Sequence, residues 1–149
     1  MTLKQLPKTI ARGFTLIEIM VVVIILGLLA AVVVPNVMDA LDDAEINKAR
    51  ADMNALQTAL KMYRMQNFAY PTTEQGLEAL VEQPTLAPVP RNWKQGGYIE
   101  KLSKDPWGND YIYNKPGEGG HEFDIMSLGA DGISGGEGKN ADISIWDDQ

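Results

Sequence analysis

The stretch Gly13-Phe14-Thr15-Leu16-Ile17-Glu18 decides how this chain is organised. It precedes an unbroken apolar run over residues 19–34, and Glu18 places a carboxylate directly against that run. The residues ahead of it form a short leader whose charged side chains are all basic: Lys4, Lys8 and Arg12. An ionisable side chain at membrane depth costs about 2.5–3.5 kcal/mol even on lenient insertion scales, so such residues usually mark function. We therefore expect a membrane anchor that carries a functional carboxylate.

Two interpretations of this anchor compete. A secretory signal peptide would use Leu29-Ala30-Ala31 as its small-residue cleavage site. That interpretation leaves Glu18 unexplained and removes a segment that continues smoothly into a long helix. Gly13 followed by Phe14, with Glu18 four residues further on, instead resembles the processing site of type IV prepilins and pseudopilins. The resemblance implies cleavage between Gly13 and Phe14 by a prepilin peptidase at the cytoplasmic face, N-methylation of Phe14, and retention of the apolar helix for anchoring and polymerisation.

The hydrophobic pattern predicts one long helix. Residues 14–34 would span about 31 Å at 1.5 Å per residue, which is close to the thickness of a bilayer core. Pro35 has no N–H to donate to the carbonyl of Ala31, so we expect a kink or a loosened turn there. Beyond it, apolar residues recur at steps of three and four: Ile46, Ala49, Met53, Leu56, Leu60 and Tyr63. The pattern predicts about 50 helical residues, half in the membrane and half packed on a globular domain.

The remaining sequence predicts a small antiparallel sheet. Thr72 with Gln75 has the spacing of a capping box and predicts a short helix that ends before Pro84, followed by a loop over residues 84–97. Residues 111–113 and 123–126 flank a glycine-rich turn and predict a hairpin that packs on the long helix. The expected fold class is α+β, with a leader at 1–13, a transmembrane and polymerisation helix at 14–35, and a globular domain at 36–149.

The composition excludes several classes of protein. The chain has 149 residues and a formal net charge of −7, and such an acidic surface repels nucleic acid. It contains no cysteine, so neither a disulfide framework nor thiol chemistry is available. His121 is the single histidine and lies in a glycine-rich turn, and there is no phosphate-binding loop or hydrolase elbow. We therefore expect neither an enzyme nor a small-molecule substrate.

Four later blocks sharpen the resemblance, and they lie at residues 70–81, 97–99, 105–109 and 127–132. They read YPTTEQGLEALV, GYI, DPWGN and SLGADG, and together they resemble the major pseudopilin of type II secretion. The resemblance implies a pilin-like fold in a single-pass protein of the bacterial inner membrane, with its C-terminal domain in the periplasm. It also implies a periplasmic homopolymer that works with minor pseudopilins and an inner-membrane secretion platform to drive folded proteins through an outer-membrane secretin.

The glycine-rich segment at residues 128–142 is the candidate metal site. Asp131 and Asp142 supply hard oxygen ligands across a flexible loop, and Ca²⁺ takes six to eight oxygens, some of them from backbone. The spacing is not that of an EF-hand, so on the residues alone the calcium signal is weak and a plain flexible turn at Asp131-Gly132 is the alternative. The resemblance implies calcium held by the side chains of Asp131 and Asp142 and the backbone oxygens of Leu128 and Ile133. Some family members have a second Asp where this chain has Ala141, a departure that Asn140 or Glu137 would have to compensate.

Two residues of the long helix are expected to act in assembly. After cleavage, the amine of Phe14 is a cation in a low-dielectric setting, and its natural partner is Glu18 of the chain docking beside it. Pro35 marks a soft point at which the helix stretches as a subunit leaves the bilayer. A static kink is the alternative, and a filament with a fully regular helix through Tyr63 would remove the stretching hypothesis.

Two other functions remain open at this point. The chain could be a monomeric, membrane-anchored periplasmic domain that binds calcium, since the anchor and the acidic loop serve that role too. A major type IV pilin is disfavoured by the missing cysteines and the short acidic C-terminus. Chemical cross-linking separates the first alternative from a filament subunit, because only a polymer gives ladders.

The processing site predicts the mass of the mature protein. Cleavage after Gly13 leaves a chain that begins at Phe14 and carries one extra methyl group, because the peptidase reaches the cytoplasmic side of the anchor. Intact mass spectrometry of the protein from its membrane measures this. A chain that begins near Val32 would show signal-peptidase cleavage and contradict the assignment.

Overall fold

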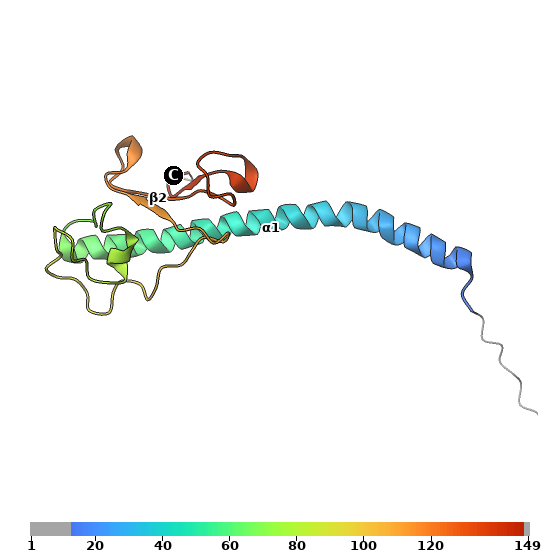
Figure 1. The fold of residues 1–149 in the computed structure, drawn as a ribbon, viewed down its shortest axis with the longest axis horizontal. Coiled ribbons are helices and arrows are strands. Elements are labelled where there is room, and N and C mark those ends of the chain that lie inside the picture. Colours follow the sequence, from blue (N-terminus) through green and yellow to red (C-terminus); the bar gives the residue numbers. More distant parts are fainter. Residues whose placement is uncertain (1–12, 148–149) are drawn as a thin grey trace, which may run out of the picture. The chain divides into compact units, whose positions relative to one another are not determined.

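The computed structural model describes residues 13–147 and has an α+β fold, as predicted (Figure 1). Helix α1 runs from Leu16 to Asn67, and three short 3₁₀ helices follow it, η1 (Leu77–Leu80), η2 (Glu118–Gly120) and η3 (Gly138–Asn140). Three strands form one antiparallel sheet in the order β1-β2-β3. Their bounds are Ile112–Asn114 for β1, Asp124–Ser127 for β2 and Ile143–Ser144 for β3. Residues 1–12 of the predicted leader lie outside the described residues.

Helix α1 has 52 residues and continues across Pro35 without a break. It contains an 18-residue window with a mean hydropathy of 3.1, of which none is buried, so by length and composition it is able to cross a membrane. The chain divides into two compact units between Asp39 and Ala40. The predicted stretching at Pro35 concerns the assembled state and stays a prediction.

The second half of α1 supplies one wall of the hydrophobic core. The predicted stripe is confirmed, because every member is buried except Ile46, which is partly buried against the others. The stripe packs on residues from the rest of the globular unit: Tyr70, Leu77, Ala79, Leu80, Tyr111, Tyr113, Phe123, Ile125, Ile143 and Ile145. An aromatic contact joins the two sides, since Tyr63 of the stripe and the partly buried Tyr98 have 5.3 Å between their ring centroids.

The predicted hairpin is confirmed and gains a third strand. β1 pairs with β2 so that Tyr113 lies opposite Ile125, and both side chains face the core. β3 then pairs with β2 through Ser127 and Ile143, which the sequence analysis did not predict. A two-residue strand is too short to show alternation, so only its pairing partner reveals it.

The capping box at Thr72 forms, but the helix that it predicts is shorter than expected. The backbone N–H of Thr72 donates to the Gln75 side chain at 3.0 Å, and the N–H of Gln75 donates to the Thr72 hydroxyl at 3.2 Å. These bonds close a turn rather than start a helix. Gly76 then adopts a left-handed conformation with φ of 62°, which interrupts the helical backbone. Only η1 follows, and the segment from Pro84 to Gly97 contains no helix or strand, as predicted.

A buried carboxylate ties the turn at residues 105–109 to the sheet. One oxygen of Asp105 accepts the N–H groups of Trp107 and Asn109 at 3.1 and 2.7 Å. The other accepts the Ser127 hydroxyl at 2.7 Å, at the end of β2. Asn109 in turn donates its side-chain amide to the carbonyl of Gly129 at 3.0 Å. The turn therefore holds the first residues of the glycine-rich loop in place.

The core predicts a clear stability contrast on a single helix. Leu60 is 0% exposed and Met62, two residues on, is 50% exposed. Leu60→Ala is expected to lower the free energy of unfolding by about 2–5 kcal/mol, because it leaves a cavity in the core. Met62→Ala is the matched control and should change it by less than about 0.5 kcal/mol. Thermal unfolding of the detergent-solubilised chain measures both, and equal effects would contradict the packing described here.

Candidate assembly and cation sites

Thr15 and Glu18 form a capping box at the start of α1, which the sequence analysis missed. One oxygen of the Glu18 carboxylate, Oε2, accepts both the backbone N–H and the hydroxyl of Thr15 at 2.8 Å. The N–H of Glu18 donates back to the Thr15 hydroxyl at 3.2 Å. The predicted start at Phe14 is therefore wrong, and the helix begins at Leu16. The signal was present as Thr-x-x-Glu immediately ahead of an apolar run.

The apolar half of α1 is not buried by other residues that the structure describes. Phe14 is exposed, and so are the large apolar side chains of the anchor from Leu16 to Val34. A contiguous apolar surface of this size on a single chain marks a membrane or protein contact. A helix that is apolar on all sides is covered either by lipid or by other protein.

The glycine-rich loop after β2 closes on itself through backbone hydrogen bonds. The N–H of Ala130 donates to the carbonyl of Lys139 at 2.9 Å. Gly129 has φ of 67°, and a Cβ there would come within 2.8 Å of the same carbonyl, so glycine is required. The ammonium of Lys139 then lies 3.6 Å from the carboxylate of Asp42 on α1. One backbone hydrogen bond therefore closes the base of the loop, and one ion pair connects the loop to α1.

The four residues predicted to bind calcium all lie in this loop. The carboxylates of Asp131 and Asp142 do not share a hydrogen-bond partner. Oδ1 of Asp131 accepts the N–H of Ile133 at 3.0 Å. Oδ2 of Asp142 accepts the Ser134 hydroxyl at 3.1 Å and the N–H of Gly135 at 3.0 Å. Leu128 follows β2 directly and is partly buried. Sequence reasoning did not single out Ser134, whose contact with Asp142 depends on how the loop closes.

One atom of this loop fits a cation. Oδ1 of Asp142 is buried and has no hydrogen-bond partner, which is costly for a carboxylate oxygen unless a positive charge is beside it. Within residues 13–147 there is no cluster of three or more His, Cys, Asp or Glu side chains that could hold a metal. An ion here would therefore need backbone carbonyls or water as its further ligands, as calcium accepts. The parts that Asn140 and Glu137 would play stay predictions.

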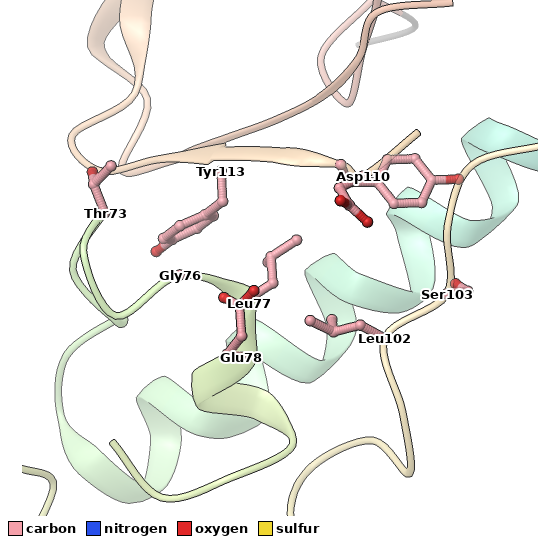
Figure 2. A pocket seen from close by; sticks show the side chains of 9 residues that line it. Thr73, Gly76, Leu77, Glu78, Leu102, Ser103, Asp110 and Tyr113 are labelled. Carbon is pink, nitrogen blue, oxygen red and sulfur yellow. The ribbon is translucent and has the colours of Figure 1, made fainter. Parts of the chain in front are cut away.

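A separate cavity of about 200 Å³ lies between η1 and β1 (Figure 2). Leu77, Leu102 and Tyr113 line it, and the carboxylates of Glu78 and Asp110 belong to the same lining. Burial raises the pKa of Tyr113 well above its usual value, so its hydroxyl stays protonated and donates to the carbonyl of Pro71 at 2.9 Å. The lining therefore combines apolar side chains with acidic ones.

The comparisons with known proteins identify the family. The family model described as "Type II secretion system (T2SS), protein G" matches residues 36–146. The chain belongs to this protein G family. A second model, the "Prokaryotic N-terminal methylation motif", matches residues 9–34 and therefore covers Gly13, Phe14 and Glu18. The predicted resemblance is confirmed.

Named relatives are similar along nearly the whole chain. Type II secretion system core protein G of Pseudomonas aeruginosa is 58% identical over 135 residues, which are 91% of this chain and 94% of that protein. The protein of the same name from Vibrio cholerae is 57% identical over 137 residues, 92% of each chain. These names describe a component of a secretion system rather than an enzyme.

A solved structure confirms the pilin-like architecture of this protein G family member. The crystal structure of the major pseudopilin from the type 2 secretion system of enterohaemorrhagic Escherichia coli is 49% identical in sequence, with a TM-score of 0.67. The match covers 76% of this chain and 96% of that chain. A long helix packed on a small antiparallel sheet is therefore the family's architecture as well as the one described here.

Proposed function

We propose that this chain is the structural subunit of the periplasmic pseudopilus of type II secretion. The observation that carries the proposal is the exposed apolar half of α1, which begins with Glu18 and continues into a packed globular unit. Membership of the protein G family also supports the proposal. A pseudopilus subunit needs an apolar surface that lipid covers before assembly and that other copies cover afterwards.

The proposed route begins in the inner membrane, with one membrane span and the globular domain in the periplasm. A prepilin peptidase removes the leader after Gly13, and Phe14 becomes the methylated N-terminus. Copies then polymerise with one another and with minor pseudopilins on the inner-membrane platform. The growing filament helps to drive folded proteins through an outer-membrane secretin, so the chain works by assembly and not by catalysis.

Glu18 is proposed to direct this assembly by exchanging partners. In the isolated chain its carboxylate caps α1 through Thr15. After cleavage, the charged amine of Phe14 on a neighbouring copy competes for that carboxylate in an environment from which water is excluded. Removing one partner of such a pair strands the other charge at a cost of about 3–5 kcal/mol. The pairing therefore favours docking in one register.

Two substitutions at Glu18 separate the charge from the cap. Glu18→Gln keeps a capping box, because glutamine accepts the same bonds from Thr15, but it removes the negative charge. Glu18→Ala removes both. We expect both variants to insert in the membrane and to yield at least tenfold fewer sheared filaments, since a loss of only 1.4 kcal/mol is already tenfold in association. Immunoblots of membrane and sheared fractions measure this.

Thr15→Val is the matched control for the cap, because it removes the hydroxyl bonds and leaves the charge of Glu18. It should assemble better than either Glu18 variant. If Glu18→Gln assembles as well as the parent chain while Thr15→Val does not, the carboxylate only caps the helix and the proposed pairing is wrong.

Calcium is proposed as the clamp on the glycine-rich loop. The buried and unpaired Oδ1 of Asp142 supports this, as does the absence of cysteine, which leaves the loop without a covalent clamp. Asp131, the backbone oxygens of Leu128 and Ile133, and Asp142 would hold the ion. The ion supplies charge and ligation only, and it offsets the cost of ordering glycine-rich backbone, about 1–2 kcal/mol per residue.

The clamp predicts that calcium controls thermal stability. Chelation should lower the melting temperature of the detergent-solubilised chain and increase proteolysis between Gly132 and Asn140, because stabilisation follows the ligand concentration. Asp131→Ala and Asp142→Ala should each melt as the chelated protein does and ignore added calcium. Asp110→Asn, which removes an exposed carboxylate outside the loop, should keep the full calcium response. Identical melting of the parent chain in calcium and in chelator would contradict the site.

A further inference from the structure

The end of α1 carries an exposed apolar patch beside basic side chains, which we call the Phe68 patch. Phe68 is 84% exposed and Met65 is 79% exposed. Two hollows of about 450 and 430 Å³ meet at Phe68, and Val89 and Arg91 line the first while Lys61 and Arg64 line the second. The patch is defined by these residues: Lys61, Arg64, Met65, Phe68, Val89 and Arg91.

The backbone of Phe68 is in a left-handed conformation, which is unfavourable for a bulky side chain. Its φ is 61°, the single positive value among the non-glycine residues that the structure describes. A helix that ends this way normally uses glycine or asparagine, because a bulky side chain is strained in the left-handed region. Within residues 13–147, the Phe68 ring takes part in no aromatic contact. Strained residues of this kind cluster where a protein contacts a ligand or partner.

Side-chain hydrogen bonds connect the loop beside the patch to its surroundings. The side-chain amide of Gln75 donates to the carbonyls of Leu86 and Pro88 at 2.8 and 3.0 Å, which fixes the neighbouring loop. The Asn92 side chain donates to the carbonyl of Gln66 at 3.3 Å and joins that loop to α1. A surface ordered in advance loses less entropy on binding.

The charge of the patch indicates a partner that is acidic around an apolar hollow. Arg64 is paired with Glu122, whereas Arg91 has no hydrogen-bond or ion-pair partner in the described part of the chain. The cavity of Figure 2 has the complementary charge, since its mixed lining includes the carboxylates of Glu78 and Asp110 beside the apolar side chains of Leu77 and Leu102. Asp110 contacts Lys104 at 3.1 Å, but an exposed pair of this kind contributes little and exchanges readily.

We infer that the Phe68 patch of one copy docks on the Glu78 cavity of the next, with the Phe68 ring in the cavity and Arg91 beside Glu78. The cavity has a volume of about 200 Å³ and is open to the surface, so a ring presented by another copy can enter it and contact Leu77 and Leu102. Patch and cavity share no residue, so each copy can use both at once. Such a contact is heterologous, so it can repeat from copy to copy along an open polymer when the rotation between copies does not close a ring.

This inference rests on the proposed function, and one substitution tests it without a loss of stability. Phe68→Gly removes an exposed ring and relieves the left-handed backbone, which glycine adopts without strain, so the melting temperature of the full chain should stay equal or rise. Sheared filaments from cells with the complete secretion system should nevertheless fall about tenfold. Phe68→Tyr, which keeps the ring, is the control and should assemble well. Filament yield from Phe68→Gly equal to that of the parent would overturn the inference.

Charge reversal tests the pairing of the two surfaces. Arg91→Glu and Glu78→Arg should each lower the filament yield, and the double variant should recover it, because the reversed charges again meet across the contact. Lys94→Glu, on the same loop outside the patch, should leave the yield unchanged. A double variant no better than either single one rejects the pairing. If the parent chain forms no filaments at all, the proposed function fails and the inference falls with it; filaments that ignore these variants defeat the inference alone.

Discussion

The apolar half of α1 cannot remain in water, and the rest of the structure depends on how it is covered. Its side chains are exposed on all faces of the helix, so no fold of this one chain hides them. Lipid solves the problem for a single copy, and identical helices solve it for an assembly. On the proposed function, a subunit exchanges one cover for the other as it passes from the membrane into the filament, with little net change in buried apolar surface.

The globular unit has a hydrophobic core of its own, built from residues that follow the anchor. The apolar stripe of α1 continues the same helix into a core that includes Tyr113, Phe123 and Ile125. Buried carboxylates then hold the loops on that core. Asp124 accepts the N–H of Glu118 at 2.7 Å and the indole of Trp146 at 2.8 Å, as Asp105 does for its own turn. These bonds hold the loops of the globular unit on its core.

Features with a regular period or a strong local motif could be predicted from the sequence. The stripe from Ala49 to Tyr63 and the hairpin around Tyr113 and Ile125 were found because helices and strands impose periods of 3.6 and 2. The start of α1 was wrong by two residues because the Thr15 cap was overlooked. β3 escaped because two residues have no period, and its pairing depends on contacts distant in sequence.

The candidate sites were predictable only as far as residue type carries the chemistry. Glu18 was found because a carboxylate beside an apolar run is costly, and Asp131 and Asp142 because oxygen ligands sit in a flexible loop. The buried, unpaired oxygen of Asp142 and the strained backbone of Phe68 are products of tertiary packing. No local pattern encodes either of them, so both required the folded chain.

A cryo-electron microscopy reconstruction of sheared filaments, from cells that produce this chain with its secretion apparatus, tests the central claim most directly. The account predicts a filament of this one subunit, with residues 19–34 of neighbouring copies packed against each other in its core and the globular domains outside. A chain that stays monomeric in the membrane, or a filament in which residues 19–34 lie outside the core, would contradict it.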